Sequence, residues 1–190
     1  MTAVFGDDGR GRCPWGAAPA DYREYHDVEW GRPVRGQHAL FERLCLEGFQ
    51  SGLSWLTILR KRVDFRRAFA GFDPQRVARF GERERESLLA DRTIVRNRAK
   101  IDATIANARA VLELDTPLDE LLWSFAPERR DPHARPATME EVPATTPESK
   151  AMAKALRGRG FRFVGPTTCY ALMQATGMVD DHLAGCWLAG

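Results

Sequence analysis

Apolar residues recur at three- and four-residue spacing along much of the chain, which predicts amphipathic helices. The clearest periodic stretches cover residues 40–49, 53–60, 101–112 and 118–125. Asp73 followed by Pro74 marks a further helix start, because aspartate caps a helix and proline suits its first position. No segment alternates apolar and polar residues as a half-buried strand would. The pattern therefore predicts an all-α fold.

Prolines interrupt this pattern between residues 126 and 147, in a polar stretch that predicts an extended surface loop. We expect a helix to follow this loop and to run to about Leu156. Either Thr145 or Thr146 can cap that helix, and Glu148 stands three residues after Thr145, as in a capping box.

Residues 154–176 predict two helices joined by a tight turn, with the first helix ending at Gly158 or Gly160 and the second beginning at Pro166. Gly165 has no Cβ, so a phosphate group could approach its backbone closely and meet the free N–H groups of the following helix. This arrangement is typical of a helix-hairpin-helix that binds a DNA backbone, and a generic turn is the alternative. The residues expected to contact DNA here are Gly165, Thr167, Thr168, Arg162 and the flanking Arg159.

At 190 residues, with 44% hydrophobic and 28% charged residues, the chain has the size and composition of one globular domain covering residues 1–190. It contains no run of 18 apolar residues, and its N-terminus lacks the basic-then-apolar pattern of a secretion signal. We therefore expect a soluble, cytoplasmic, monomeric protein that does not contact a membrane.

The formal net charge of +2 is small, but lysine and arginine gather in three stretches of the chain. Such clusters in a nearly neutral chain suit one-sided contact with a polyanion, and solvated helix faces are the alternative. The three clusters are Arg60, Lys61, Arg62, Arg66 and Arg67; Arg92, Arg96, Arg98 and Lys100; and Lys150, Lys154, Arg157, Arg159 and Arg162.

Two cysteines and two histidines form a candidate metal site. Cys13 and His26 lie near the N-terminus, whereas His182 and Cys186 stand four apart near the C-terminus and would face the same way on a helical turn. Two Cys and two His are a complete tetrahedral ligand set for structural zinc. Spacing alone leaves open that Cys13 is an exposed thiol and that His182 is a core or DNA-facing residue. The other two cysteines, expected to be buried thiols, are Cys45 and Cys169.

A second group of residues combines aromatic rings with one carboxylate. Glu47 lies among apolar residues, where burial is costly unless the carboxylate has a partner. Aromatic rings around a carboxylate suit a flat, electron-poor or cationic ring, held by stacking and by a charged hydrogen bond. Core packing is the alternative for each tryptophan. The aromatic residues concerned are Trp15, Tyr22, Tyr25, Trp30 and Trp55.

Seven motifs occur in a specific order between residues 12 and 186: RCPW (12–15), YHDVEWG (25–31), LEGFQSGLSW (46–55), IVRNRAKI (94–101), LWSF (122–125), GFRFVG (160–165) and VDDH (179–182). In this order and spacing they resemble the 3-methyladenine DNA glycosylase I family of bacterial enzymes. The resemblance covers nearly the whole chain. It implies a helix-hairpin-helix glycosylase that excises 3-methyladenine, with 3-methylguanine as a second candidate base, from double-stranded DNA containing alkylated purines.

The resemblance also implies roles for individual residues. One zinc ion per chain would tie the terminal segments, residues 12–30 and 179–190, together. The ligands would be Cys13, His26, His182 and Cys186. The flipped base would be held by Glu47, Tyr25 and Trp55, with Trp15 and Tyr22 lining the pocket. Gln50 and Leu53 would lie near the gap that the base leaves in the duplex.

Two positions bear on the mechanism that the resemblance implies. Asp180 aligns with an aspartate that assists base departure in the wider superfamily, so it either has a catalytic electrostatic role or caps the segment before His182, which we favour. The lysine nucleophile of strand-cleaving relatives would fall at about Thr167, and threonine cannot form a Schiff base. We therefore expect a monofunctional enzyme that leaves an abasic site.

Two other functions are compatible with parts of the sequence. A zinc-stabilised DNA-binding module without catalysis would use the same hairpin and metal, but would not need a carboxylate among aromatic rings. A scaffold that binds acidic proteins through its basic clusters is the other alternative.

Overall fold

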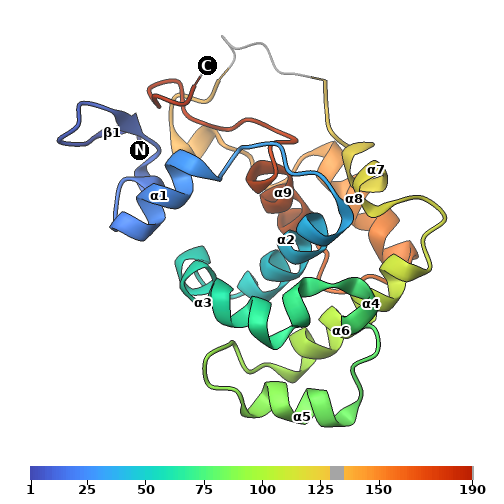
Figure 1. Cartoon of the computed structure of the whole chain (residues 1–190). Coiled ribbons are helices and arrows are strands. Elements are labelled where there is room, and N and C mark those ends of the chain that lie inside the picture. The colour runs from blue at the N-terminus through green and yellow to red at the C-terminus, as the bar shows by residue number, and fades with distance from the viewer. Residues whose placement is uncertain (129–134, 190) are drawn as a thin grey trace.

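The computed structural model describes residues 1–128 and 135–189, and in this part of the chain it is almost entirely helical (Figure 1). This confirms the predicted all-α class. Residues 129–134 of the predicted proline-rich loop and Gly190 of the predicted terminal segment lie outside the described residues. The helices are α1 (Ala20–Val28), α2 (Gln37–Gln50), α3 (Trp55–Ala68), α4 (Pro74–Val77), α5 (Glu82–Ala90), α6 (Arg98–Leu112), α7 (Leu118–Trp123), α8 (Pro147–Gly158) and α9 (Pro166–Ala175).

Helix α2 lies at the centre of the molecule, where α3, α6, α7 and α9 all contact it (Figure 1). Its buried positions include Leu40, Phe41, Leu44 and Phe49, which share the three- and four-residue spacing that predicted the helix. Glu47 stands three residues after Leu44 on the same buried face, and burial continues on the opposite face at Leu46. A helix surrounded on most sides belongs to the core of the domain, so a polar side chain at one of its buried positions, as at Glu47, is removed from bulk water.

Helices α8 and α9 pack against one another and form the predicted pair joined by a turn. Thr146 caps α8, and its capping-box partner is Ser149, so the alternative cap at Thr145 with Glu148 is wrong. A serine hydroxyl reaches back to the cap as a glutamate would, which is why the spacing rule selected the wrong pair. The Asn107 side chain on α6 fixes the turn by pairing with both the N–H and the C=O of Arg162.

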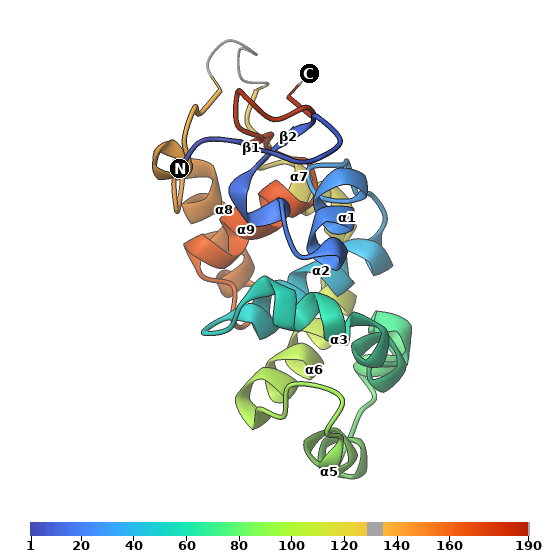
Figure 2. The ribbon, with the colours of Figure 1, turned by 90° about the vertical axis from the view of Figure 1, so that its left-hand side faces the viewer.

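The segment that precedes α1 and the segment that follows α9 lie side by side, as the two views show (Figure 1, Figure 2). Strand β1 (Val4–Phe5) pairs antiparallel with β2 (Gly11–Arg12), which contradicts the expectation that no strand would form. Strands of two residues are too short to show a sequence period. The backbone of Gly11 accepts a hydrogen bond from Trp187 N, and a Cβ on Gly11 would lie 2.2 Å from Gly185 O. A glycine is therefore required where the two ends meet.

Part of the predicted surface loop packs against these termini. A short 3₁₀ turn at Met139–Glu141 follows the undescribed residues. The backbone N–H of Met139 donates to Met1 O, and Ala184 N donates to Pro136 O. Residues 136–142 therefore pack against the two terminal segments, and we call them the covering segment.

The first basic cluster is largely neutralised by acidic residues of other elements. Arg60 pairs with Asp21, Arg62 with Glu29, and Arg66 with Glu42. Arg67 pairs with both Asp64 and Asp91. In this cluster the arginines therefore act mainly in intramolecular ion pairs, and the polyanion hypothesis loses its support there. Among the described residues, no helix has the length and hydropathy needed to cross a membrane.

Candidate functional site

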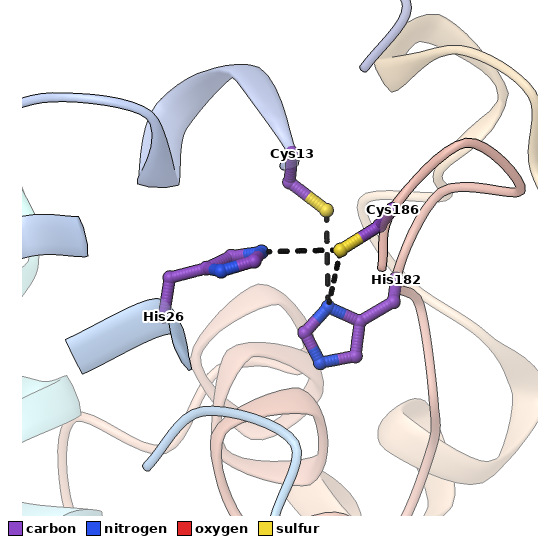
Figure 3. Close-up of side chains that lie close together, drawn as sticks. All are labelled: Cys13, His26, His182 and Cys186. Atoms are coloured by element: carbon purple, nitrogen blue, oxygen red, sulfur yellow. Dashed lines mark hydrogen bonds between the residues drawn. The ribbon is translucent and has the colours of Figure 1, made fainter. Parts of the chain in front are cut away.

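The four predicted metal ligands converge between the N-terminal and C-terminal segments (Figure 3). Cys13 precedes the 3₁₀ turn Pro14–Gly16, His26 lies on α1, and His182 and Cys186 follow α9. Their ligand atoms all lie within 4.8 Å of one another, and the four side chains are buried. The segment that contains His182 and Cys186 is a series of turns, so the expectation that a helical turn aligns these two residues is wrong.

The spacing of these atoms fits a metal ion. Cys186 Sγ lies 3.6 Å from both His26 Nε2 and His182 Nδ1, and Cys13 Sγ lies 3.9 Å from His182 Nδ1. A tetrahedron with metal–sulfur bonds of about 2.3 Å and metal–nitrogen bonds of about 2.0 Å has edges of roughly 3.3–3.8 Å. Two thiols and two imidazoles at this separation can hold a metal ion.

Neighbouring residues orient the His26 ring. Asp27 accepts a hydrogen bond from His26 Nδ1 at 2.8 Å, which leaves Nε2 facing the cluster. Partial burial opposes ionisation of Asp27, but hydrogen bonds from Arg12, His26 and Trp187 outweigh it and lower the pKa of Asp27 to about 2. A Cβ on Gly16 would lie 2.5 Å from the His26 ring, so only glycine fits at that position.

The hydrogen bond between the two thiols of the cluster raises the pKa of Cys13 and lowers that of Cys186. The hydrogen bond from Cys13, followed by those from His182 and His26, lowers the pKa of Cys186 far below its ordinary value. A thiolate is the form of cysteine that binds a metal. The hydrogen bonds around Cys186 therefore favour the metal-binding form of this one thiol.

A cavity of about 210 Å³ opens beside the metal-ligand cluster. Five aromatic rings form one wall, and Tyr25 and Trp55 have ring centroids 5.5 Å apart. Another part of the lining comes from α9, from the segment after it and from the covering segment. The residues that line the cavity are Trp15, Tyr22, Tyr25, Trp30, Glu47, Gln50, Trp55, Met139, Val142, Ala171, Gln174 and Asp181.

Glu47 is the carboxylate at the end of α2 that lines this cavity, and it is only 5% exposed. Its side chain makes no hydrogen bond to the described residues. Burial raises the pKa of Glu47 to about 8, although the positive charge of Arg43 opposes this effect. Burial, followed by the Glu47 charge, also raises the pKa of Tyr22 to about 12. The cavity thus offers a carboxyl group that has no hydrogen-bond partner among the described residues and lies among aromatic rings.

Arg43 lies behind this wall, in an ion-pair cluster with Glu29 and Arg62. Its Nη2 is 2.8 Å from Glu29 Oε2, and its guanidinium carbon is 6.0 Å from the centroid of the Tyr25 ring. Arg62 pairs with the same carboxylate at 2.6 Å. The cluster fixes one positive charge beneath the aromatic wall, where it partly offsets the cost of ionising Glu47.

Asp180 lies outside the cavity lining and faces the neighbouring backbone. Its Oδ1 accepts from His182 N at 3.2 Å, and its Oδ2 lies 2.7 Å from Arg135 Nη2. Burial opposes ionisation, but the hydrogen bonds from Arg135 and His182 leave the pKa of Asp180 below its ordinary value. These contacts are those of a capping residue. The aspartate that lines the cavity is its neighbour Asp181, which the sequence did not single out.

The residues expected to contact DNA lie on two turns, α2–α3 and α8–α9, or at the helix ends beside them. Gln50 lines the cavity, and Leu53 is 42% exposed on the turn between α2 and α3. The buried Lys100 ammonium donates to Phe49 O and Ser51 O and so fixes the start of this turn. On the α8–α9 turn, a Cβ on Gly165 would meet no atom within 4 Å, so its backbone is open to an approaching group. Arg162 and Thr167 are exposed beside it, and Thr168 is half-buried.

Five lining residues escaped the sequence analysis: Met139, Val142, Ala171, Gln174 and Asp181. The three-residue spacing of Ala171 and Gln174 places both on one face of α9, but that face resembles an ordinary core-facing surface. Met139 and Val142 belong to the proline-rich stretch, which composition assigned to the surface. Cys45 and Cys169 are buried, as predicted.

Comparisons with known proteins show which family this chain resembles. The model of the methyladenine glycosylase family matches residues 15–189. DNA-3-methyladenine glycosylase 1 of Escherichia coli is 46% identical over 179 residues, which cover 92% of this chain and 95% of that protein. A crystal structure of 3-methyladenine DNA glycosylase I superposes with a TM-score of 0.88 at 45% identity, covering 93% of this chain and 98% of the other. Another, in complex with 3-methyladenine, has a TM-score of 0.86 at 30% identity, covering 93% and 96%. The chain therefore belongs to the methyladenine glycosylase family.

Proposed function

We propose that this chain is a DNA repair glycosylase that removes 3-methyladenine from alkylated double-stranded DNA. The observation that carries the proposal is the buried Glu47 carboxyl that lines an aromatic-walled cavity, in a chain whose relatives bear this activity in their names. 3-Methylguanine is the second candidate base. A monomeric state and a cytoplasmic location stay predictions.

The reaction is hydrolysis of one N-glycosidic bond. Methylation at N3 places positive charge on adenine, so the base can leave with the electron pair of the C1′–N9 bond as neutral 3-methyladenine. Positive charge builds on the sugar, as in other glycoside hydrolysis. The oxygen of a water molecule then bonds to C1′ and its proton passes to solvent, which leaves an abasic site.

The cavity residues bind and orient the extruded base, since a base within the duplex is out of reach. Tyr25 and Trp55 offer ring faces for stacking, and Trp15 and Tyr22 complete the aromatic wall. Glu47 recognises the base through a charged hydrogen bond. A cationic ring also lowers the cost of ionising the buried Glu47 carboxyl, so the pocket favours alkylated over neutral purines.

Two turns and the helix ends beside them would hold the duplex. We assign Arg162 and Gly165 on the α8–α9 turn, together with Thr167 and Thr168 in the first turn of α9, to the phosphate backbone, because the α9 N-terminus there is accessible. Gln50 and Leu53 would fill the gap left by the base, since Gln50 lines the cavity and Leu53 projects beside it.

Cys13, His26, His182 and Cys186 would hold a single zinc ion. With four protein ligands the ion has no open position, so it supplies stability and no chemistry. It would fasten the two terminal segments next to the aromatic wall, since Trp15 lies within 5.1 Å of the His26 ring, centroid to centroid.

Release of free base from DNA treated with dimethyl sulfate tests this proposal. The wild-type chain should release 3-methyladenine and leave an abasic site, whereas a zinc-stabilised DNA-binding module would retain the DNA without releasing base. The Glu47→Gln variant tests the assigned role: unchanged excision together with unchanged affinity for free 3-methyladenine would refute it.

A further inference from the structure

One face of helix α6, which packs against α2 (Figure 1), makes hydrogen bonds to both of the turns that we assign to DNA. Lys100, Thr104 and Asn107 share this face, because residues three or four apart in a helix lie on one side. All three residues are buried. Lys100 contacts the end of α2 and Asn107 contacts the α8–α9 turn. None of the three has a role in the reaction as described above.

The Lys100 side chain holds the beginning of the α2–α3 turn. The residue is only 8% exposed, and its ammonium donates to Phe49 O at 2.8 Å and to Ser51 O at 2.5 Å. These carbonyls lie at the end of α2, where the partial negative charge of a helix C-terminus stabilises a cation. Gln50 stands between the two acceptors, and Leu53 follows on the same turn. Lys100 therefore sets the position from which these two residues project.

The Asn107 side chain holds the α8–α9 turn in a similar way. Its amide accepts from Arg162 N at 2.7 Å and donates to Arg162 O at 3.1 Å, so it satisfies both backbone groups of that residue. The next residue, Phe163, has a φ of 55°, a left-handed conformation that a non-glycine residue keeps only where its surroundings hold it. A Cβ on Gly48 of α2 would lie 3.4 Å from Phe163 Cβ, so this turn also rests against α2.

The contacts of Lys100 and Asn107 fix the separation of the two turns. The two residues are seven positions apart, which is two helical turns or about 10 Å along the axis of α6. Extruding a base costs unpairing and unstacking energy. This cost is best offset when the phosphate contact and the filling of the gap occur together. A displacement of about 1 Å between groups that must act together can lower a rate by about a hundredfold.

We propose that Lys100 and Asn107 are positioning residues for base extrusion, and that α6 is a spacer that lets both turns engage the duplex at once. The inference rests on the proposed glycosylase function and on the assignment of the two turns to DNA. Neither residue lines the cavity, so both act through the backbone of the turns. Binding of free 3-methyladenine should therefore be independent of the spacer.

Two substitutions each detach α6 from one turn. Lys100→Met keeps the length of the side chain and removes the ammonium donor. Asn107→Leu has nearly the same shape and removes both hydrogen bonds to Arg162. Asn107→Asp keeps the bond from Arg162 N, and it replaces Asn107→Leu if that variant does not fold. Each change should lower kcat/KM for release of 3-methyladenine from methylated duplex DNA about tenfold, the scale of one or two lost hydrogen bonds.

The double variant separates a shared spacer from two independent local effects. A spacer that is detached at one end no longer fixes the separation, so detaching the other end should add little. The double variant should therefore lose about tenfold in kcat/KM, whereas independent effects would multiply to about a hundredfold. Stability behaves differently, because sites about 10 Å apart contribute independently to it. The losses of unfolding free energy in the two single variants should therefore add in the double variant.

Thr104→Val is the matched control. Thr104 lies between the two residues on the same buried face, and its hydroxyl donates to Lys100 O within α6. The substitution removes a buried hydrogen bond without detaching α6 from either turn. Its kcat/KM per folded molecule should therefore equal that of the wild type, although its stability should fall.

The measurement is the initial rate of 3-methyladenine release from dimethyl sulfate-treated duplex DNA, divided by the fraction of each sample that binds free 3-methyladenine. This fraction counts folded molecules with an intact cavity, so partial unfolding does not affect the comparison. Tenfold losses in both single variants that do not multiply in the double variant, with wild-type values for Thr104→Val and for the affinity of free base, support the inference.

Three results overturn it: losses that multiply in the double variant, wild-type rates in both single variants, or a matching loss of affinity for free 3-methyladenine. A tenfold loss in Thr104→Val would also overturn it, because any lost hydrogen bond on this face would then have the same effect. Failure of the wild type to release 3-methyladenine would instead refute the proposed function.

Discussion

Replacing Glu47 by glutamine should change how the stability of the protein depends on pH. Burial raises the pKa of Glu47 from 4.5 to about 8 in the folded chain. As the pH rises above 4.5, the unfolded chain loses this proton while the folded chain keeps it. Ionisation therefore favours unfolding, and stability is lost progressively until the pH passes the folded-state pKa near 8.

The size of this effect follows from the two pKa values. At pH 7 the Glu47 carboxyl lowers the free energy of unfolding by roughly 3 kcal/mol. Between pH 6 and pH 8 this destabilising effect grows by about 2 kcal/mol. Glutamine has the same shape and stays neutral. Any fixed cost of burying its amide is independent of pH. The test is therefore how the stability difference between Glu47→Gln and the wild type changes with pH, and not its value at a single pH.

Urea unfolding of the wild type and of Glu47→Gln at pH 6, 7 and 8, with zinc present throughout, measures this slope. The variant should become more stable relative to the wild type by about 2 kcal/mol over this range. Glu24→Gln is the control, because Glu24 is exposed on α1 and its variant should keep the wild-type dependence. A stability difference between Glu47→Gln and wild type that is the same at pH 6 and pH 8 would refute the reasoning.

Three further predictions follow from the site. Asp180→Asn should excise 3-methyladenine at a near-normal rate, because Asp180 caps the backbone of His182; a severe loss in a glycosylase assay would assign it a catalytic role. Cys186→Ser should lower both the zinc content, measured by atomic emission, and the melting temperature, whereas Cys45→Ser should leave the zinc content unchanged. Borohydride treatment during turnover should trap no covalent enzyme–DNA adduct, since Thr167 cannot form a Schiff base; an adduct on a denaturing gel would contradict a monofunctional reaction.

The sequence predicted the helices whose core-facing residues follow a regular spacing or whose start carries a capping signature. Helix α2 shows its spacing because Leu40, Leu44 and Phe49 face the core, and Asp73 caps α4 as the Asp-Pro signature indicates. The four metal ligands were predicted from the resemblance to a known family, since spacing alone also allowed Cys13 to be an exposed thiol and His182 to be a core or DNA-facing residue. Their convergence depends on the packing of the two termini, which no local pattern encodes.

The remaining features arise from contacts between residues far apart in the chain. The arginines of α3 resembled a nucleic-acid contact because their partners, such as Asp21 and Glu42, lie 39 and 24 residues away. Met139 lines the cavity because backbone contacts hold its segment against the termini, although its proline-rich surroundings indicated a surface loop. A hydrogen bond between Gln174 and Asp181 links α9 with the segment beyond it, and these polar residues carry no signature of a pocket.

The most direct test of the central claim is chromatography of the bases released when the purified chain acts on methylated duplex DNA. The account predicts that free 3-methyladenine appears with time and that the DNA strand stays intact until the abasic sites are cleaved by alkali. Glu47→Gln should reduce this release while the protein remains folded. Binding of the wild-type protein to methylated DNA without release of free base would contradict the account.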